Sequence, residues 1–345
     1  MSVQQSQYLR KWQLVVANSQ KILDLSQFRI VFNITAEDLE TPNEAFIRIY
    51  NLALPRPGVT APGATIDTSE FSSVSLQAGY ETGPFGSIFN GTIKQFRRGR
   101  EEGSGNVNTY LDILAADGDA FYNSGFTNTK IPAGTPQAAI VAAGLASASQ
   151  TVPTGLAEDA NLAGGIRALP RGKVMVGLTR EFLRHTAWSN GWSWSIQNGK
   201  VLMYPETGYV DGEAVVLSAA TGMIGLPEQT DQGINIKCLL NPKIKVGTRV
   251  QINNADIPVA ALPINKGNFS IGAAEIASKL RIASLSNDGF YRVLVVEYQG
   301  DTRGDPWYCT LTCLALNPST NPLSAVPAGG GLPPGAPANS GQELD

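Results

Sequence analysis

The sequence predicts a mainly β protein with a small α/β middle domain, and three observations support this fold class. Apolar and polar side chains alternate over many short segments, which is the period of a half-buried strand. The 36 glycines and 21 prolines fall largely between such segments, as turn residues do. Apolar side chains at helical spacing appear mainly within residues 121–213. With 345 residues, we expect domains at 1–120, 121–213 and 214–317, followed by a tail at 318–345.

The first domain is expected to contain about seven short strands. Alternation is clearest where Phe28, Ile30 and Phe32 share one face. The last two strands are predicted to form a hairpin joined by a charged loop over residues 97–106. Successive short strands favour an antiparallel sheet or barrel over βαβ units. The predicted strands cover residues 12–17, 21–25, 28–34, 44–52, 74–80, 87–96 and 108–115.

The middle domain is expected to combine two helices with a hairpin. Residues 136–147 are rich in alanine and place apolar side chains at helical spacing. Residues 178–188 form a second predicted helix, in which Trp188 is expected to be available for burial. Asn198 and Gly199 are a strong signal for a two-residue hairpin turn.

The third domain begins with the stretch around which the chain is organised, residues 215–252. Every second residue over 234–240 is apolar, which predicts a strand with one buried face. Pro242 interrupts the pattern because proline donates no backbone hydrogen bond. A second strand-like segment follows over residues 245–252, so the pair forms either a hairpin or a sheet corner.

Two further strands complete the third domain, over residues 290–298 and 307–316. Regular alternation in the first places Val293 and Val295 on one face and Tyr298 on the other, with both faces covered. Beyond these strands the tail contains many prolines and glycines and few large apolar residues. Such a composition cannot form a core, and we expect the tail to order only against a partner.

Composition limits the possible functions. The hydrophobic fraction of 43% and the charged fraction of 16% are ordinary for a folded soluble protein. A net charge of -3 argues against a dedicated nucleic-acid binder. No apolar run reaches the roughly 20 residues of a membrane helix, and the N-terminal residues lack the apolar core of a signal peptide. We therefore expect the chain to fold in a cytoplasm.

Residues suited to catalysis or metal binding are few, so we predict no enzyme activity, no cofactor and no metal. His185 is the only histidine, which leaves little material for a catalytic triad or a zinc site. The three cysteines are expected to be small, reduced core side chains. Three carboxylate pairs lie in glycine-bearing loops, where solvation explains them better than glycosidase or calcium chemistry: Glu101 with Glu102, Asp117 with Asp119, and Asp301 with Asp305.

A basic run lies next to the predicted charged loop. It consists of Lys94, Arg97, Arg98 and Arg100, with Phe96 between them. Contact with nucleic acid is one interpretation. A solvated hairpin balanced by the adjacent glutamates is the favoured one.

Several stretches together resemble a known family. A threonine-glycine turn and a leucine-proline step precede INIKCLLNP and then IKVG. Upstream lies LPRGKVMVGLTREFLRHTAWSNGWSWSIQNGKVLMYP, and downstream YRVLVVEYQGDTRGDPWYCTLTCLAL. In order and spacing these resemble the baseplate hub proteins of contractile-tailed bacteriophages, which are similar to the hub part of type VI secretion spikes. The resemblance covers roughly the last half of the folded chain.

The resemblance implies a structural role and a set of partners. It implies two tail-tube-like antiparallel β-barrels per chain and a homotrimer that joins a sixfold tail tube to a threefold central spike around a channel for DNA. Tail tube, spike, tape-measure and wedge proteins would be the partners, and DNA would pass without specific binding. The location would be the virion baseplate, after assembly in the host cytoplasm.

Two alternatives remain open at this stage. One is a peptidoglycan-degrading enzyme associated with the hub, and the other is a tail-tube or type VI spike component. For partner contact we select residues in the proline-rich loop at 55–65, in the turn between the last two strands, and in the tail: Pro55, Pro57, Asp301, Arg303, Trp307, Pro318 and Pro322.

Overall fold

The computed structural model describes residues 7–17, 22–52, 72–103, 106–149, 161–162, 169–210, 212–230, 233–253 and 289–316. The predicted loop at 55–65 and the tail at 318–345 lie outside these ranges. No helix within the described residues is both long and apolar enough to cross a membrane.

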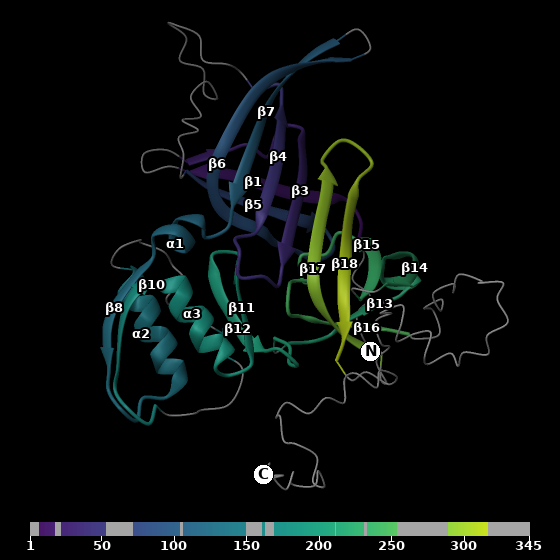
Figure 1. Ribbon diagram of the computed structural model, residues 1–345. Coiled ribbons are helices and arrows are strands. Elements are labelled where there is room, and N and C mark those ends of the chain that lie inside the picture. Colours follow the sequence, from purple (N-terminus) through teal and green to yellow (C-terminus); the bar gives the residue numbers. More distant parts are fainter. Residues whose placement is uncertain are drawn as a thin grey trace, which may run out of the picture.

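All strands predicted for the first region are present (Figure 1). Their apolar faces are buried, as in β3, where Ile30, Phe32 and Ile34 are at most 2% exposed. The strands are β1 (Arg10–Ala17), β2 (Ile22–Asp24), β3 (Ile30–Glu37), β4 (Glu44–Tyr50), β5 (Ser73–Tyr80), β6 (Phe85–Gly103) and β7 (Asn106–Ala116).

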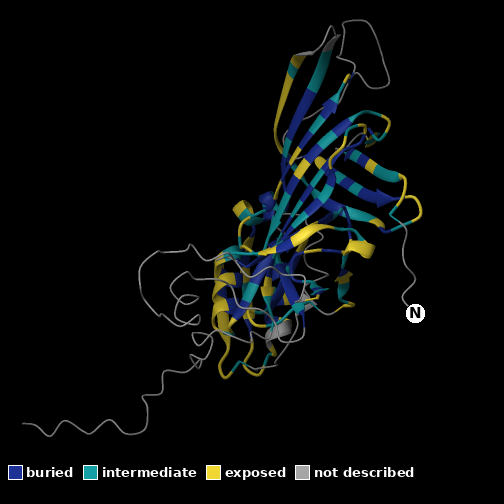
Figure 2. Ribbon diagram, turned by 90° about the vertical axis from the view of Figure 1, so that its right-hand side faces the viewer, coloured by how far each residue is buried: buried dark blue, intermediate teal, exposed yellow. Residues whose placement is uncertain are grey.

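The charged loop predicted at 97–106 is not a loop. Strands β6 and β7 continue through it, and the ladder between them runs as far as Gly103 opposite Asn106. The composition of residues 97–106 indicated a solvated loop. In the structure the backbone groups of this segment are paired in a continuous antiparallel ladder. Charged side chains are compatible with such a ribbon because they can point into solvent. We call residues 97–103 with 106–112 the arm, which projects beyond the rest of the sheet (Figures 1 and 2).

Within its described residues, 212–230, 233–253 and 289–316, the third region contains a short 3₁₀-helix and six strands. The segments predicted at 234–240 and 245–252 do not form a hairpin, because β15 pairs with β14 and β18, whereas β16 pairs with β13 and β17. Residues 240–248, which include two turns, separate the two strands, and the predicted sheet corner stays a prediction. The elements are β13 (Val215–Leu217), η2 (Ala219–Thr221), β14 (Met223–Gln229), β15 (Ile234–Leu239), β16 (Arg249–Ile252), β17 (Phe290–Asp301) and β18 (Trp307–Ala315).

The first and third regions share one sheet, which corrects the prediction of two separate barrels. The sheet has 13 strands, and within the described residues no closed barrel is present. The connection is the antiparallel pair of β3 with β17, which runs from Val31 opposite Asp301 to Glu37 opposite Val295. A single cluster of buried apolar side chains extends across both regions. Alternation within single strands such as β3 predicted buried faces but could not predict this long-range pairing.

A bulge in β17 overturns the predicted facing of that strand. Val293 lies opposite Cys313, but Val295 lies opposite Thr312, so Leu294 is an extra residue. As a result Val293 is buried while Val295 points to the other face. A bulge shifts the alternation by one residue, and the sequence pattern carried no sign of it.

The middle region is a separate α/β unit with its own core. Its two principal predicted helices and its hairpin are confirmed, and the hairpin turn has positive φ at Asn198 and Gly199, as a type I′ turn requires. A two-stranded sheet, β8 with β10, packs against α2 and α3. The elements are α1 (Asp119–Ser124), β8 (Phe126–Ile131), α2 (Gln137–Ser149), β9 (Asn161–Leu162), β10 (Lys173–Leu178), α3 (Thr179–Trp188), β11 (Trp192–Gln197) and β12 (Lys200–Pro205).

The tip of the β11–β12 hairpin fixes the middle region to the large sheet. The Asn43 side chain donates to the Ile196 carbonyl at 2.9 Å, and the Gln197 side chain donates to the Glu37 carbonyl at 2.8 Å. The buried carboxylate of Asp117 accepts a hydrogen bond of 2.7 Å from the backbone N–H of Gly199. These contacts connect two units that have separate cores.

Candidate functional site

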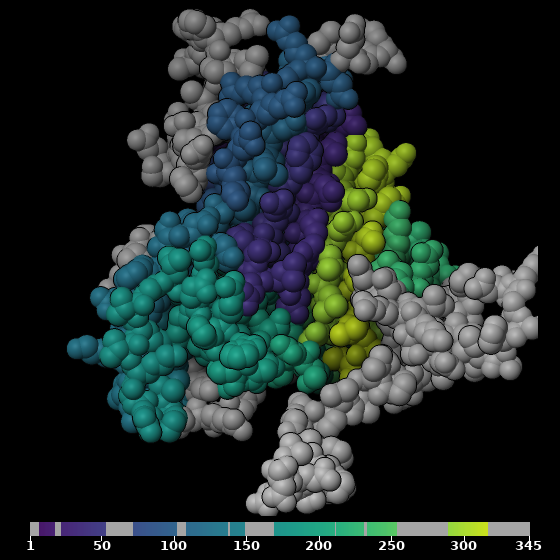
Figure 3. All heavy atoms as spheres, in the orientation of Figure 1, coloured from purple at the N-terminus to yellow at the C-terminus, as the bar shows by residue number. Residues whose placement is uncertain are grey.

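One face of the large sheet is polar and open in the single chain. The opposite face forms the core. Cross-strand register therefore brings the outward side chains of six neighbouring strands, β15, β18, β17, β3, β4 and β7, into one surface. Figure 3 shows β7, β4, β3, β17 and β18 side by side. We call this surface the polar face; its partly or fully exposed side chains include Asn235, Lys237, Thr310, Thr312, Glu297, Gln299, Asn33, Thr35, Glu44, Arg48 and Tyr110.

Charge on the polar face is locally balanced around Arg48. Its guanidinium donates to both carboxylate oxygens of Asp112, at 2.6 and 3.0 Å, and lies 3.8 Å from a Glu101 oxygen. It also stacks over Tyr110, with 4.1 Å to the ring centroid. The hydrogen bond to Asp112 is the main cause that raises the pKa of Arg48. The result is a hydrated surface without an uncompensated cation at this point.

Three of the residues selected for partner contact take part in contacts within the chain: Asp301, Arg303, which donates to the Gln27 carbonyl at 3.3 Å, and Trp307. The Asp301 side chain is largely buried and forms an ion pair of 2.6 Å with Arg29. Burial acts to raise the pKa of Asp301, but hydrogen bonds from Arg29 and from the backbone N–H groups of Arg303 and Gly304 outweigh it and lower the pKa. Arg303 itself is exposed.

Trp307 is only 1% exposed and packs inside the joint between the two regions. It makes edge-to-face contacts with Trp12 and Phe32, at centroid distances of 6.3 and 5.6 Å. Arg10 lies over the same ring at 5.4 Å and donates to the Asp301 carbonyl at 2.9 Å. The structure thus gives the β17–β18 turn a role in holding β1 to the joint, and Arg303, Asp305 and Pro306 are exposed in it.

The remaining residues selected for partner contact cannot be placed. Pro55, Pro57, Pro318 and Pro322 lie outside the described residues. Contact with a partner therefore stays a prediction for all seven selected residues.

The candidate catalytic side chains are not brought together. His185 is exposed on α3, and Asp119 forms an ion pair of 2.9 Å with Lys94. Asp117 is buried in the junction described above, and burial raises its pKa to about 7. Among the described residues there is no cluster of three or more histidine, cysteine, aspartate or glutamate side chains suited to a metal.

The three cysteines are buried and free. Cys238 of β15 lies directly opposite Cys309 of β18 in the ladder, a proximity that the sequence did not reveal. Burial raises the pKa of the Cys309 thiol well above its usual value, and the neighbouring Cys238 adds to the effect. The Cys309 thiol is therefore a protonated core side chain at neutral pH.

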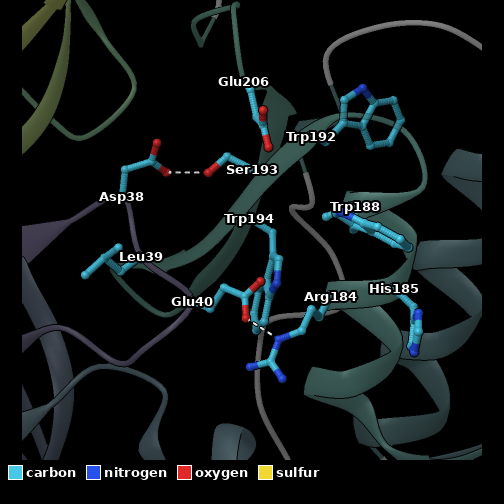
Figure 4. A pocket seen from close by; sticks show the side chains of 11 residues that line it. Asp38, Leu39, Glu40, Arg184, His185, Trp188, Trp192, Ser193, Trp194 and Glu206 are labelled. Carbon is cyan, nitrogen blue, oxygen red and sulfur yellow. Dashed lines mark hydrogen bonds and ion pairs between the residues drawn. The ribbon is translucent and has the colours of Figure 1, made fainter. Parts of the chain in front are cut away.

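A pocket of about 400 Å³ lies between the β3–β4 turn, α3 and β11 (Figure 4). Aromatic rings of Trp188, Trp192 and Trp194 line it. Trp188 is 79% exposed, so the expected burial of this ring is wrong. A short apolar helix pattern indicated which side chains could be buried, but not that the neighbouring layer ends before it reaches Trp188.

The fold is similar to that of several solved structures. A tail protein from Neisseria meningitidis matches with a TM-score of 0.53 and 11% identity, over 89% of this chain and 97% of that chain. The 43 kDa tail protein of prophage MuSo2 from Shewanella oneidensis matches with a TM-score of 0.51 and 8% identity, over 88% and 98% of the two chains.

A third similar structure comes from a secretion system. It is an Escherichia coli component of the type VI secretion system, described as structurally similar to the T4 bacteriophage tail proteins gp27 and gp5. Its TM-score is 0.51 at 13% identity, over 90% of this chain and 79% of that chain. No protein-family model and no curated protein matches the sequence. These structures confirm the predicted resemblance at the level of the fold.

Sequence reasoning missed the polar face, the arm and the aromatic pocket. The polar face could have been found by listing outward residues on each predicted strand. The arm and the pocket depend on where neighbouring strands and layers end, and no local pattern reports that.

Proposed function

We propose that the chain is a structural assembly protein of a phage-type tail, namely the baseplate hub that joins a sixfold tail tube to a threefold central spike. The main support is the likeness to two tail-protein structures over nearly the whole length of both chains. The partners would be two further copies of this chain, the tube and spike proteins, and the tape-measure and wedge proteins. The location would be the virion baseplate, after assembly in the host cytoplasm. The role is one of shape and surface complementarity, without catalysis.

The polar face is suited to surround a channel for DNA. A channel wall must remain hydrated and must not hold phosphates tightly, because strong phosphate binding would hinder passage. On this face Arg48 is neutralised by Asp112, and Lys237 is placed over the Tyr308 ring at 4.6 Å. In a ring of copies, sheet faces directed toward the axis would provide such a wall.

The decisive experiment is to locate the chain in assembled particles. Gold-labelled antibody against the chain should mark isolated tails at the junction between tube and spike. Label spread along the tube would favour a tube subunit instead. Label absent from tails but present in type VI assemblies would replace the phage hub by a type VI spike component; the Escherichia coli structure is a component of that secretion system. Clearing of peptidoglycan by the purified chain would support the enzymatic alternative.

A further inference from the structure

The aromatic pocket has an excess of negative charge. Asp38, Glu40 and Glu206 line it, against one guanidinium from Arg184. Arg184 is already engaged by Glu40 and by Glu181 at 3.0 Å. The Asp38 carboxylate accepts only a neutral donor among its described contacts, the Ser193 hydroxyl at 3.1 Å. The pocket can therefore accept a further cation.

The aromatic lining favours a particular kind of cation. An exposed indole such as Trp188 attracts a guanidinium or ammonium group to its face. A guanidinium can also form two parallel hydrogen bonds with one carboxylate while its plane stacks on a ring. Arginine on an extended segment is therefore the occupant whose chemistry best fits these side chains.

The arm presents such arginines. Arg97, Arg98 and Arg100 are exposed on β6, and no ion pair is described for any of them within the part of the chain that the structure covers. Strand β5 pairs with β6 only as far as Thr92, and β4 pairs with β7 only as far as Tyr110. Beyond Gly99 opposite Tyr110, where Arg100 lies, β6 and β7 therefore form a two-stranded ribbon without a neighbouring strand. Such a ribbon is marginally stable in water, so contact with a partner would stabilise this end of the arm.

The arm and the pocket lie beyond opposite ends of β3 and β4: Tyr50 at one end of β4 pairs with Tyr110 next to the arm, and the β3–β4 turn at the other end lines the pocket (Figure 1). A chain therefore cannot insert its own arm into its own pocket, and the occupant must come from another copy. Contacts between different surfaces of identical chains produce a closed ring when the rotation between neighbours permits it.

We propose that an arginine on the arm of one copy enters the aromatic, acidic pocket of a neighbouring copy, and that this contact drives self-association. This inference deepens the proposed function. It rests on that function in one respect, the expectation that the ring closes at three chains.

Sedimentation of the full chain measures its self-association. The proposal is tested in two ways, by reversing charges on the pocket and on the arm, and by comparing low with high salt. The pocket variant is Glu206→Lys, and the arm variant carries Arg98→Glu with Arg100→Glu. Each alone should weaken association about tenfold, and mixing the two variants should restore much of it, because opposite charges again meet. Raising the salt concentration should weaken the wild-type contact. Trp188→Ala should weaken association similarly without loss of folding stability.

Matched controls change the same charges elsewhere. Glu228→Lys and Lys130→Glu alter exposed side chains outside the pocket and the arm, and they should associate like the wild type. Unfolding curves establish that each variant is folded. A wild-type chain that stays monomeric at every concentration and salt, or variants that associate normally, would overturn the arm–pocket contact. If the natural occupant of the pocket is a small molecule or another protein, the variants would associate like the wild type. Neither result affects the labelling of particles, so failure of the contact and failure of the hub proposal are distinguishable.

Discussion

The large sheet and the middle α/β unit expose different kinds of surface. The open face of the sheet carries mainly polar side chains, with Phe46 among them at 38% exposure. The two-stranded sheet of the middle unit exposes Phe126, Val174 and Val176 at 39%, 65% and 66%, because α2 and α3 cover only its other face. Apolar side chains gathered on one surface commonly mark contact with another molecule. The comparison indicates that the sheet is built to face water and the middle unit to be covered.

The largest expected difference between the two regions concerns their tryptophans. Trp307→Ala removes a ring buried in the joint of the sheet and should lower the free energy of unfolding by about 3–5 kcal/mol. Trp188→Ala removes an exposed ring from the middle unit and should change it by no more than about 0.5 kcal/mol. Denaturant titration of both variants measures the contrast. Similar losses would contradict the assigned burial.

The contact between the regions should depend on pH through Asp117. Its folded pKa of about 7 exceeds the unfolded value of about 3.9, so the folded state binds the extra proton between these values. The wild type should therefore lose stability as pH rises from 4.5 to 8. Asp117→Asn keeps an acceptor for Gly199 without the charge, and at pH 8 it should be more stable than the wild type by on the order of 2 kcal/mol. Unfolding curves at the two pH values check this; a gain at pH 4.5 as large as that at pH 8 would contradict it.

Within the sheet, Asp301 should show the opposite dependence. Its pKa is lowered, so its ion pair with Arg29 contributes stability above the unfolded value of about 3.9, and this is lost as pH falls through the folded pKa. Asp301→Asn should cost about 1–2 kcal/mol at pH 7, since Arg29 is partly exposed. The difference from the wild type should shrink toward pH 3 in the same unfolding assay. A constant difference would assign the effect to something other than charge.

The smallest expected effect tests the open apolar face. Val176→Thr on β10 should alter the unfolding free energy by no more than about 0.5 kcal/mol, because the side chain is already hydrated. The matched change Val293→Thr buries a hydroxyl in the sheet core and should cost about 1–3 kcal/mol. Thermal or denaturant unfolding compares the two. Equal costs would mean that Val176 is covered in the chain by itself.

The accuracy of the sequence predictions follows the range of the interactions involved. Alternation in β3 and β5 correctly identified buried faces, because the strand period is a local property. The Asn198–Gly199 turn was predictable for the same reason. The bulge at Leu294, the extension of β6 through a charged segment and the exposure of Trp188 were not, because each depends on a neighbouring strand or layer.

The sequence by itself determined the presence of most strands and helices and the buried faces of regular strands such as β3, since backbone propensity and hydrophobic period act within a few residues. It also limited the chemistry, with one histidine and three cysteines in the whole chain. Only the tertiary structure decided that β3 pairs with β17, that two predicted barrels share one sheet, and that an acidic aromatic pocket and an arm with exposed arginines lie beyond opposite ends of β3 and β4. Those features arise from contacts between residues as far apart as Val31 and Asp301, whose pairing is selected by packing of the complete chain.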